Sequence, residues 1–254
     1  MSDVIGSHDQ PGLRSDATRA CKAEADPFDA MPPGATIIFR FLSGLALMIC
    51  SLTLIGFAIT ELGVLRGVRN WDESINDSLA VGRSNWASDL GELVTSLGDT
   101  MPILLINGVV LIVLAALRKW RAMALVPMAL LAEITTFLAV NHLVGRPRPD
   151  VERLGPLPGT DSYPSGHIAA TLVCWVGIAA LLHLYGRVAV SRVFGVVAII
   201  LTIAMGWARV YVGMHHFLDV VFGLAMGIAA LSLAMYTLGQ RRSPDHSRNA
   251  VARG

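Results

Sequence analysis

The segment Val193–Gln240, VFGVVAIILTIAMGWARVYVGMHHFLDVVFGLAMGIAALSLAMYTLGQ, decides the fold, because it consists of two long apolar runs joined by a short polar turn. Neither Val193–Ala208 nor Val220–Gln240 contains an Asp, Glu, Lys or Arg. An α-helix rises about 1.5 Å per residue, so about 20 apolar residues cross the hydrocarbon core of a bilayer, which is roughly 30 Å thick. The segment therefore predicts two transmembrane helices whose connecting turn carries polar residues.

Four further runs with at most one charged residue lie upstream: Phe41–Thr60, Met101–Leu117, Ala122–Asn141 and Ile168–Gly186. Of the 254 residues, 54% are hydrophobic and only 15% are charged, which excludes an ordinary soluble domain. We therefore predict an all-α bundle of six transmembrane helices that occupies residues 36–238.

The two ends of the chain differ from this bundle in composition. Residues 1–35 are polar and lack the apolar core of a signal peptide, so they predict a disordered cytoplasmic tail followed by an uncleaved first span. Residues 239–254 predict a basic cytoplasmic tail. The formal net charge is +1 at pH 7, which gives no indication of a nucleic-acid partner. Of the three cysteines, Cys50 and Cys174 fall within spans, where packing is a better explanation than a disulfide.

The charges of the connections predict the orientation of the bundle. The short connections Arg118–Arg121 and Arg187–Arg192 are basic, as is the pair Arg241-Arg242 after the last span, and short basic segments favour the cytoplasmic side. The longer segment Arg66–Gly98 holds three arginines against five carboxylates and fits the other side. Both termini are then cytoplasmic, as six spans require.

Three polar clusters fall on the non-cytoplasmic face in this arrangement: Arg146–Pro149, Tyr163–His167, and the turn from Arg209 to Asp219. Titratable groups beside a bilayer are costly, so a convergent set predicts a functional site. Arg148 and Arg209 offer planar, forked donors that match phosphate oxygens, although a single arginine at a span end more often reaches for lipid headgroups. We expect Arg146 to contact lipid headgroups, or to hold the loop through backbone contacts.

His215 and Asp219 are four residues apart and hence on one face of a helix. A carboxylate there can accept the imidazole N–H and leave the other ring nitrogen with a free lone pair, which makes a positioned nucleophile. The structural alternative is a histidine at a helix start paired with a capping aspartate. We expect His216 to face water or to pack beside the site.

The sequence Pro164-Ser165-Gly166-His167 predicts a helix start. Ser165 is a favourable N-cap residue and Gly166 permits close approach of the backbone to a ligand, so the exposed N–H groups could bind an anion. His167 could protonate a departing alkoxide, although the motif is also common as a simple cap. We expect His142 and His183 to be structural.

The alternative of a metal site at His215, His216 and Asp219 is disfavoured, because two nearby guanidinium groups would repel a divalent cation and already supply positive charge. Glu133 lies inside the third span, where we expect its carboxyl to be protonated or hydrogen-bonded to a neighbouring helix, with a structural role rather than one in proton transfer.

Together these residues resemble the type-2 phosphatidic acid phosphatases, integral-membrane relatives of the vanadium haloperoxidases. The family signature is Lys, six residues, Arg-Pro; then Pro-Ser-Gly-His; then Ser-Arg, five residues, His, three residues, Asp. The second part is complete here from Pro164 to His167, and the third matches at Arg209, His215 and Asp219, with Ala208 in place of the serine. In the first part Arg148-Pro149 matches, but Asn141 stands where the family has lysine.

The resemblance implies an all-α, six-helix transmembrane fold and a metal-independent lipid phosphatase without a cofactor. It implies that His215 forms a phosphohistidine, that Asp219 orients it and that His167 acts as general acid and then base. It implies phosphate binding by the remaining matched residues, Arg148, Ser165, Gly166 and Arg209. A neutral Asn141 is expected to weaken charge neutralisation, at a cost of roughly 2–3 kcal/mol of transition-state stabilisation.

Two other functions fit part of the pattern: a haloperoxidase-like enzyme that holds vanadate, and a transporter or flippase of phosphorylated lipids. The His215–Asp219 pair has no evident use in binding alone, so the phosphatase is favoured. The expected partners are the bilayer and a lipid phosphate, the expected location is a bacterial inner membrane with the site on the non-cytoplasmic side, and the substrate and oligomeric state are left open.

Overall fold

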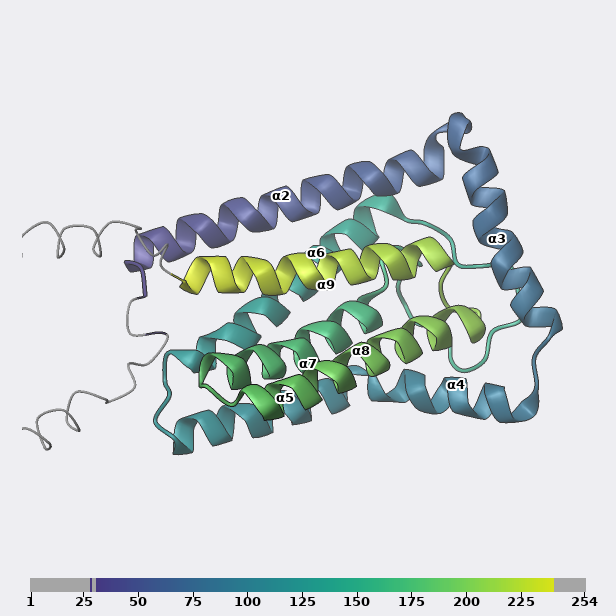
Figure 1. Ribbon diagram of the computed structural model, residues 1–254. Helices are drawn as coiled ribbons and strands as arrows, with labels where there is room; N and C mark the ends of the chain where they lie inside the picture. Colours follow the sequence, from purple (N-terminus) through teal and green to yellow (C-terminus); the bar gives the residue numbers. More distant parts are fainter. Residues whose placement is uncertain (1–27, 29–30, 240–254) are drawn as a thin grey trace, which may run out of the picture.

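The computed structural model describes residues 28 and 31–239, which form helices and connecting segments with no strand among them (Figure 1). The six predicted spans are all helical and correspond to α2 (Gly34–Glu61), α5 (Thr100–Ala116), α6 (Leu125–Val144), α7 (Gly166–Leu184), α8 (Val188–Tyr211) and α9 (Phe217–Leu238). The all-α prediction is confirmed. The predictions for the two tails concern residues that lie almost entirely outside the described part of the chain, although α2 already begins inside the predicted N-terminal tail.

Five of these helices are long and apolar enough to cross a membrane, namely α2, α6, α7, α8 and α9. Helix α5 has 17 residues and reaches that length only together with α4 (Asn85–Leu97), from which it is bent by 46°. The described chain therefore has five spans, or six if the bent pair counts as one. It is an integral membrane protein.

Helices α2, α6, α7 and α9 pack around the main apolar core, and α8 packs against the outer side of α7 (Figure 1). Small residues line the contacts between them: Ala129 on α6, Ala169 on α7 and Ala230 on α9 are all completely buried. Small side chains let helix backbones approach closely, which is the main source of helix association inside a membrane. At Gly223 the approach is so close that a Cβ would overlap the carbonyl oxygen of Ser165.

The segment 66–98, predicted to lie on the non-cytoplasmic side, contains two helices, α3 (Arg66–Val81) and α4. Helix α3 lies across the end of the bundle (Figure 1). It places Trp71, Ile75 and Leu79 at four-residue intervals, the spacing of an amphipathic helix. Its two buried residues, Asp72 and Asn76, are polar and lie under the site.

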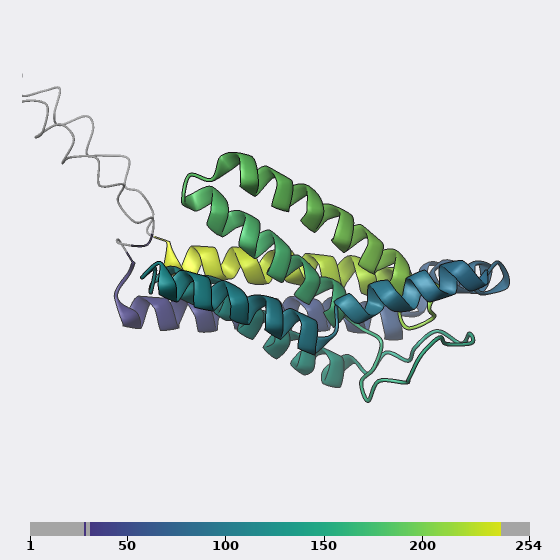
Figure 2. The same cartoon turned by 90° about the horizontal axis from the view of Figure 1, so that it is seen from below.

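The three polar clusters meet at one end of the bundle, as predicted. The loop between α6 and α7 and the turn between α8 and α9 both lie at the end opposite the first residues of α2 and the last residues of α9 (Figures 1 and 2). Gly145, with φ of 60°, ends α6 in the left-handed conformation and turns the chain into Arg146.

Candidate active site

A cavity of about 680 Å³ lies between α5, α6 and α7, at the end of the bundle where the clusters meet. Five of the seven predicted site residues line it: Arg148, Gly166, His167, Arg209 and His215. The other two, Ser165 and Asp219, are fully buried. The structure therefore brings together residues that are up to 71 positions apart in the chain.

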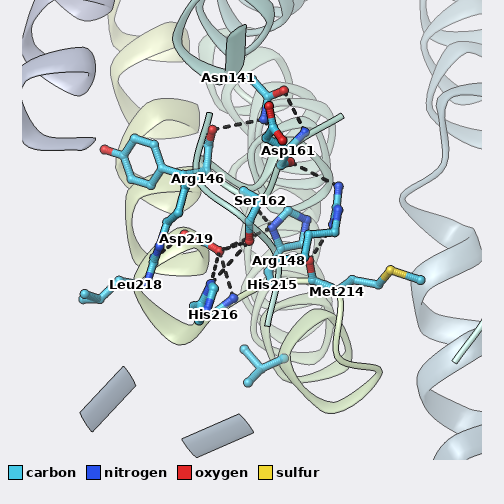
Figure 3. A network of polar contacts seen from close by, with 12 residues as sticks. Asn141, Arg146, Arg148, Asp161, Ser162, Met214, His215, His216, Leu218 and Asp219 are labelled. Atoms are coloured by element: carbon cyan, nitrogen blue, oxygen red, sulfur yellow. Dashed lines mark hydrogen bonds and ion pairs between the residues drawn. The ribbon is translucent and has the colours of Figure 1, made fainter. Parts of the chain in front are cut away.

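His215 is buried in the wall of this cavity, with 2% of its surface exposed. Its Nδ1 lies 2.6 Å from the carbonyl oxygen of Ser162, to which it donates, and 3.8 Å from Oδ2 of Asp219 (Figure 3). The prediction that Asp219 accepts the imidazole N–H directly is therefore wrong; the closer acceptor is a backbone carbonyl. The tautomer is nevertheless the expected one, because a proton on Nδ1 leaves the lone pair on Nε2.

The pKa of His215 is lowered from 6.5 to about 3. Burial is the largest cause, and the charges of Arg209 and Arg148 add to it, while Asp219 opposes the shift. The ring is therefore neutral at physiological pH, as a nucleophile requires.

Asp219 is the centre of a buried polar network at the start of α9 (Figure 3). One carboxylate oxygen accepts from Arg146 at 2.5 Å, and the other accepts from the Ser162 hydroxyl and from the backbone N–H of His216 at 2.8 Å. The last bond belongs to a capping box at the first turn of α9. Because Ser162 contributes its hydroxyl to Asp219 and its carbonyl to His215, this residue links the carboxylate to the imidazole.

Arg146 is buried, with 4% of its surface exposed, and its guanidinium bridges two carboxylates. It lies 2.5 Å from Asp219 and 2.8 Å from Asp72 of α3. The expectation that Arg146 reaches for lipid headgroups is wrong, whereas the expected backbone contact to the loop is present, because the N–H of Ser162 donates to the Arg146 carbonyl at 2.9 Å. Burial alone would lower the pKa of Arg146, but the two carboxylates raise it above its ordinary value, so the charge is retained.

His216 packs beside the site, one of the two positions expected for it. It is 4% exposed, and its ring lies between Asp219 at 3.2 Å from Nδ1 and Glu73 at 2.8 Å from Nε2. Within the part of the chain that the structure describes, no group of three His, Cys, Asp or Glu side chains is placed to hold a metal ion.

The two predicted phosphate-binding arginines differ in their contacts. Arg148 donates to the backbone carbonyls of Thr160, at 2.9 and 3.1 Å, and of Met214, at 2.5 Å, so it ties two loops together at the cavity rim. Arg209 is 3% exposed and its Nε is buried without a hydrogen-bond partner. A buried, unpaired guanidinium group is costly, and a bound anion would satisfy it.

The start of α7 forms the other side of the cavity. Ser165 is the N-cap residue, but its hydroxyl makes no capping bond and is buried without a partner. The first N–H groups of the helix and its positive end are suited to an anion. His167 follows, and its Nε2 lies 3.0 Å from Oδ1 of Asp99, a contact that the sequence did not suggest.

Asn141 does not line the cavity but holds the loop that precedes α7. Its amide donates to the carbonyls of Asp161 at 2.9 Å and Tyr163 at 3.1 Å, and its oxygen accepts from the N–H of Asp161 at 3.1 Å (Figure 3). Where the family signature has a charged lysine, this chain therefore has a residue that fixes the backbone beside Ser162.

Replacing Asn141 by alanine is expected to lower the free energy of unfolding by about 1–3 kcal/mol, because three buried hydrogen bonds are lost together. Activity should fall as well, since the same loop carries the carbonyl that holds His215. Thermal unfolding in detergent and phosphate-release assays check this. Asn141→Asp keeps only the acceptor, so its stability and activity should lie between those of the wild type and of Asn141→Ala. Stability and activity equal to the wild type in Asn141→Ala would contradict the role assigned to Asn141.

The hydrogen bond to a neighbouring helix, one of the two alternatives expected for Glu133, is not present in the described part of the chain. No described residue forms a hydrogen bond or ion pair with its carboxyl, although only 5% of its surface is exposed. It lines the same cavity as His215, at a deeper level.

Comparison with known proteins agrees with this geometry. Residues 121–243 match the model of the PAP2 superfamily, and this segment contains every predicted site residue. By this match, that segment of the chain belongs to the PAP2 superfamily, and the resemblance inferred from the motifs is confirmed.

Two solved structures share the fold. One is a transmembrane PAP2-type phosphatidylglycerolphosphate phosphatase from Bacillus subtilis, with 23% identity, a TM-score of 0.65 and coverage of 78% of this chain and 95% of that one. The other is LpxE from Aquifex aeolicus, with 22% identity, a TM-score of 0.51 and coverage of 64% and 93%. No curated protein matches the sequence significantly. At these identities the structural likeness establishes the fold alone.

Proposed function

We propose that this chain is a lipid phosphatase that hydrolyses a phosphomonoester, or the terminal phosphate of a polyprenyl diphosphate, through a phosphohistidine at His215. The observation that carries the proposal is the cavity itself, because it joins a neutral, buried histidine and an unpaired arginine to an apolar groove between membrane helices. The PAP2 match and the fold shared with a membrane lipid phosphatase support the same class of enzyme.

In the first step, Nε2 of His215 attacks phosphorus, and a P–N bond forms as the P–O bond to the lipid breaks. His167 donates a proton to the departing oxygen, so that the lipid leaves as an alcohol, or as a monophosphate if the substrate is a diphosphate. Arg148, Arg209 and the N–H groups at the start of α7 stabilise the charge on the equatorial oxygens. The scheme uses no metal and no cofactor.

In the second step, water attacks phosphorus while His167 accepts its proton, and the P–N bond breaks. Inorganic phosphate leaves and His215 returns to its neutral state. Asp219 acts through its neighbours: it holds Ser162 and the start of α9, and its charge stabilises the positive ring that forms during the attack.

We also propose that the site faces the non-cytoplasmic side of a bacterial inner membrane. The short basic connections lie at the opposite end of the bundle, and such segments favour the cytoplasm. Modification of a cysteine placed at Asp150, in the exposed loop beside the site, by an impermeant reagent on whole cells tests this orientation. Labelling only after the cells are opened would contradict it.

The test of the mechanism is to trap the covalent intermediate. The purified protein is mixed with lipid phosphate labelled on phosphorus and quenched in base, where phosphohistidine is stable. Label on His215 is expected, and a transporter would show none. Phosphate release without any labelled histidine under single-turnover conditions would overturn the mechanism.

The pH dependence follows from the low pKa of His215. With a value of about 3, the nucleophile stays neutral at pH 5, whereas an ordinary pKa of 6.5 would cost about 30-fold in kcat/KM at that pH. We expect no loss from this source between pH 7 and pH 5. The rates must be corrected for the second ionisation of the substrate phosphate, near pH 6. A 30-fold loss after that correction would contradict a buried, neutral His215.

A further inference from the structure

The cavity that contains His215 continues as a groove between α5 and α6, and its walls there are apolar except at two positions. Asn107 of α5 and Glu133 of α6 both line it, and each is only 5% exposed. Helix geometry places both at a similar depth. Asn107 is seven residues from Thr100, or about 10 Å, and Glu133 is eight residues from Asn141, or about 12 Å, measured from the helix ends at the site.

Each of these side chains has polar atoms without a partner. The Asn107 amide nitrogen donates to the carbonyl of Ile103 at 2.7 Å and to the sulfur of Cys174 at 3.4 Å, but Oδ1 is buried without a hydrogen bond. The Glu133 carboxyl has no partner among the described side chains. An unpaired polar group inside a membrane protein is costly, and such residues mark sites of function more often than sites of packing.

The free atoms define the chemistry of the missing partner. The Asn107 nitrogen is already used, so what that side chain still offers is an acceptor oxygen, and the carboxyl oxygens of Glu133 are acceptors as well. A ligand that satisfies the Asn107 oxygen must donate an O–H or an N–H, whereas a protonated Glu133 carboxyl can donate as well as accept. Unmodified hydrocarbon chains have no such group at this depth.

The lateral walls of the groove are open toward the membrane. Leu104 on α5 and Leu131 and Leu138 on α6 are 54–55% exposed. A lipid chain can therefore lie along the groove with its phosphate at His215 and its interior beside Asn107 and Glu133.

We propose that Asn107 and Glu133 form a polar subsite that recognises a hydroxyl or amide N–H on the lipid chain of the substrate, about 10–12 Å deeper than the ends of α5 and α6 at the site. The proposal rests on the phosphatase function above and deepens it. The preferred substrates are lipid phosphates with a hydroxylated or amide-containing chain, and the two polar residues set the preference.

The test uses the purified full-length protein and synthetic phosphatidic acids with a single hydroxyl near the ester, in the middle or at the tip of one acyl chain. Each is paired with its methyl ether, which keeps the oxygen but removes the donor. The wild type should show a kcat/KM about tenfold higher for the hydroxyl than for its ether at the matching depth, and no difference at the tip. A third series, with an in-chain amide, distinguishes an N–H from an O–H donor.

The variants assign the preference to the two residues. In Asn107→Leu and Glu133→Leu the ratio of hydroxyl to ether should fall toward one, and Glu133→Gln, which preserves shape and an acceptor, should retain part of it. Thr202→Val is the matched control. Thr202 also has a buried hydroxyl without a partner, but it lines a separate apolar cavity between α7, α8 and α9, so its replacement should leave the ratio unchanged.

The outcomes separate the two proposals. Phosphate release from all lipids with equal rates for hydroxyl and ether would overturn the subsite and leave the phosphatase function intact. A preference that persists in both leucine variants would also overturn it. Absence of phosphate release from every lipid phosphate would refute the function, and the subsite with it.

Discussion

Replacement of His215 by alanine is expected to reduce kcat for phosphate release by at least about a thousandfold, because no other described group can take its place. The side chain lies in the cavity wall with its lone pair on Nε2, and the neighbouring imidazole, His216, is held between Glu73 and Asp219. Measurement of kcat with a detergent-solubilised phosphatidic acid, together with phosphohistidine trapping, checks this.

The control for that variant is His183→Ala. His183 is exposed near the opposite end of α7 and lies in the last turn of that helix, so the same substitution there should leave kcat close to that of the wild type. Full activity in His215→Ala would remove the nucleophile from the scheme, and equal losses in both variants would indicate a general effect of removing an imidazole.

Replacement of Arg146 by methionine is expected to lower the free energy of unfolding by about 3–5 kcal/mol, because it leaves the carboxylates of Asp72 and Asp219 buried without their shared counter-charge. In a chain of this size such a loss corresponds to a fall in Tm of roughly 10 °C. Activity should fall in kcat more than in KM, since Arg146 positions Asp219 and does not line the cavity. Thermal unfolding and steady-state kinetics in detergent measure the two effects.

Two further variants separate charge from general packing. Arg146→Lys keeps the charge but cannot reach both carboxylates with a planar fork, so it should recover only part of the stability. Adding Asp72→Asn to Arg146→Met removes one of the stranded charges, so the double variant should be more stable than the sum of the two single losses. Strict additivity would show that the three groups do not act as a unit.

Most of the fold could be predicted from the sequence, because the length of an apolar run is fixed by the thickness of a bilayer. All six runs became helices, with ends shifted by a few residues. The part that could not be predicted is 66–98, where α3 and α4 each have too few apolar residues to span a membrane. Only α3 has a helical signal in the sequence, the spacing of Trp71, Ile75 and Leu79. A signal for α3 was therefore present, although the charge count of this segment indicated only the side of the membrane.

The residues of the site were predictable from their motifs, but their contacts were not. Arg146 looked like any arginine at a span end, because nothing in the sequence shows that Asp72, 74 positions earlier, lies beside it. Likewise the acceptor for His215 is a main-chain carbonyl, which leaves no trace in the identity of the residue that carries it. Tertiary contacts between distant segments decide both cases.

Asn141 shows how a departure from a family signature can be misjudged. As a substitute for lysine it was expected to contact phosphate more weakly, yet all its hydrogen bonds go to the loop backbone at Asp161 and Tyr163. The substitution removes a charge, but the amide also holds the loop that carries Ser162, the residue whose carbonyl accepts from His215.

The sideways opening of the groove between α5 and α6 determines how such an enzyme meets its substrate. A lipid that enters through exposed walls such as those at Leu104 and Leu131 arrives by two-dimensional diffusion and never leaves the leaflet. The encounter rate then depends on the mole fraction of the substrate in the membrane and not on its concentration in the bulk solution. Diluting the substrate with inert phospholipid would slow the enzyme, while diluting the whole vesicle suspension would not.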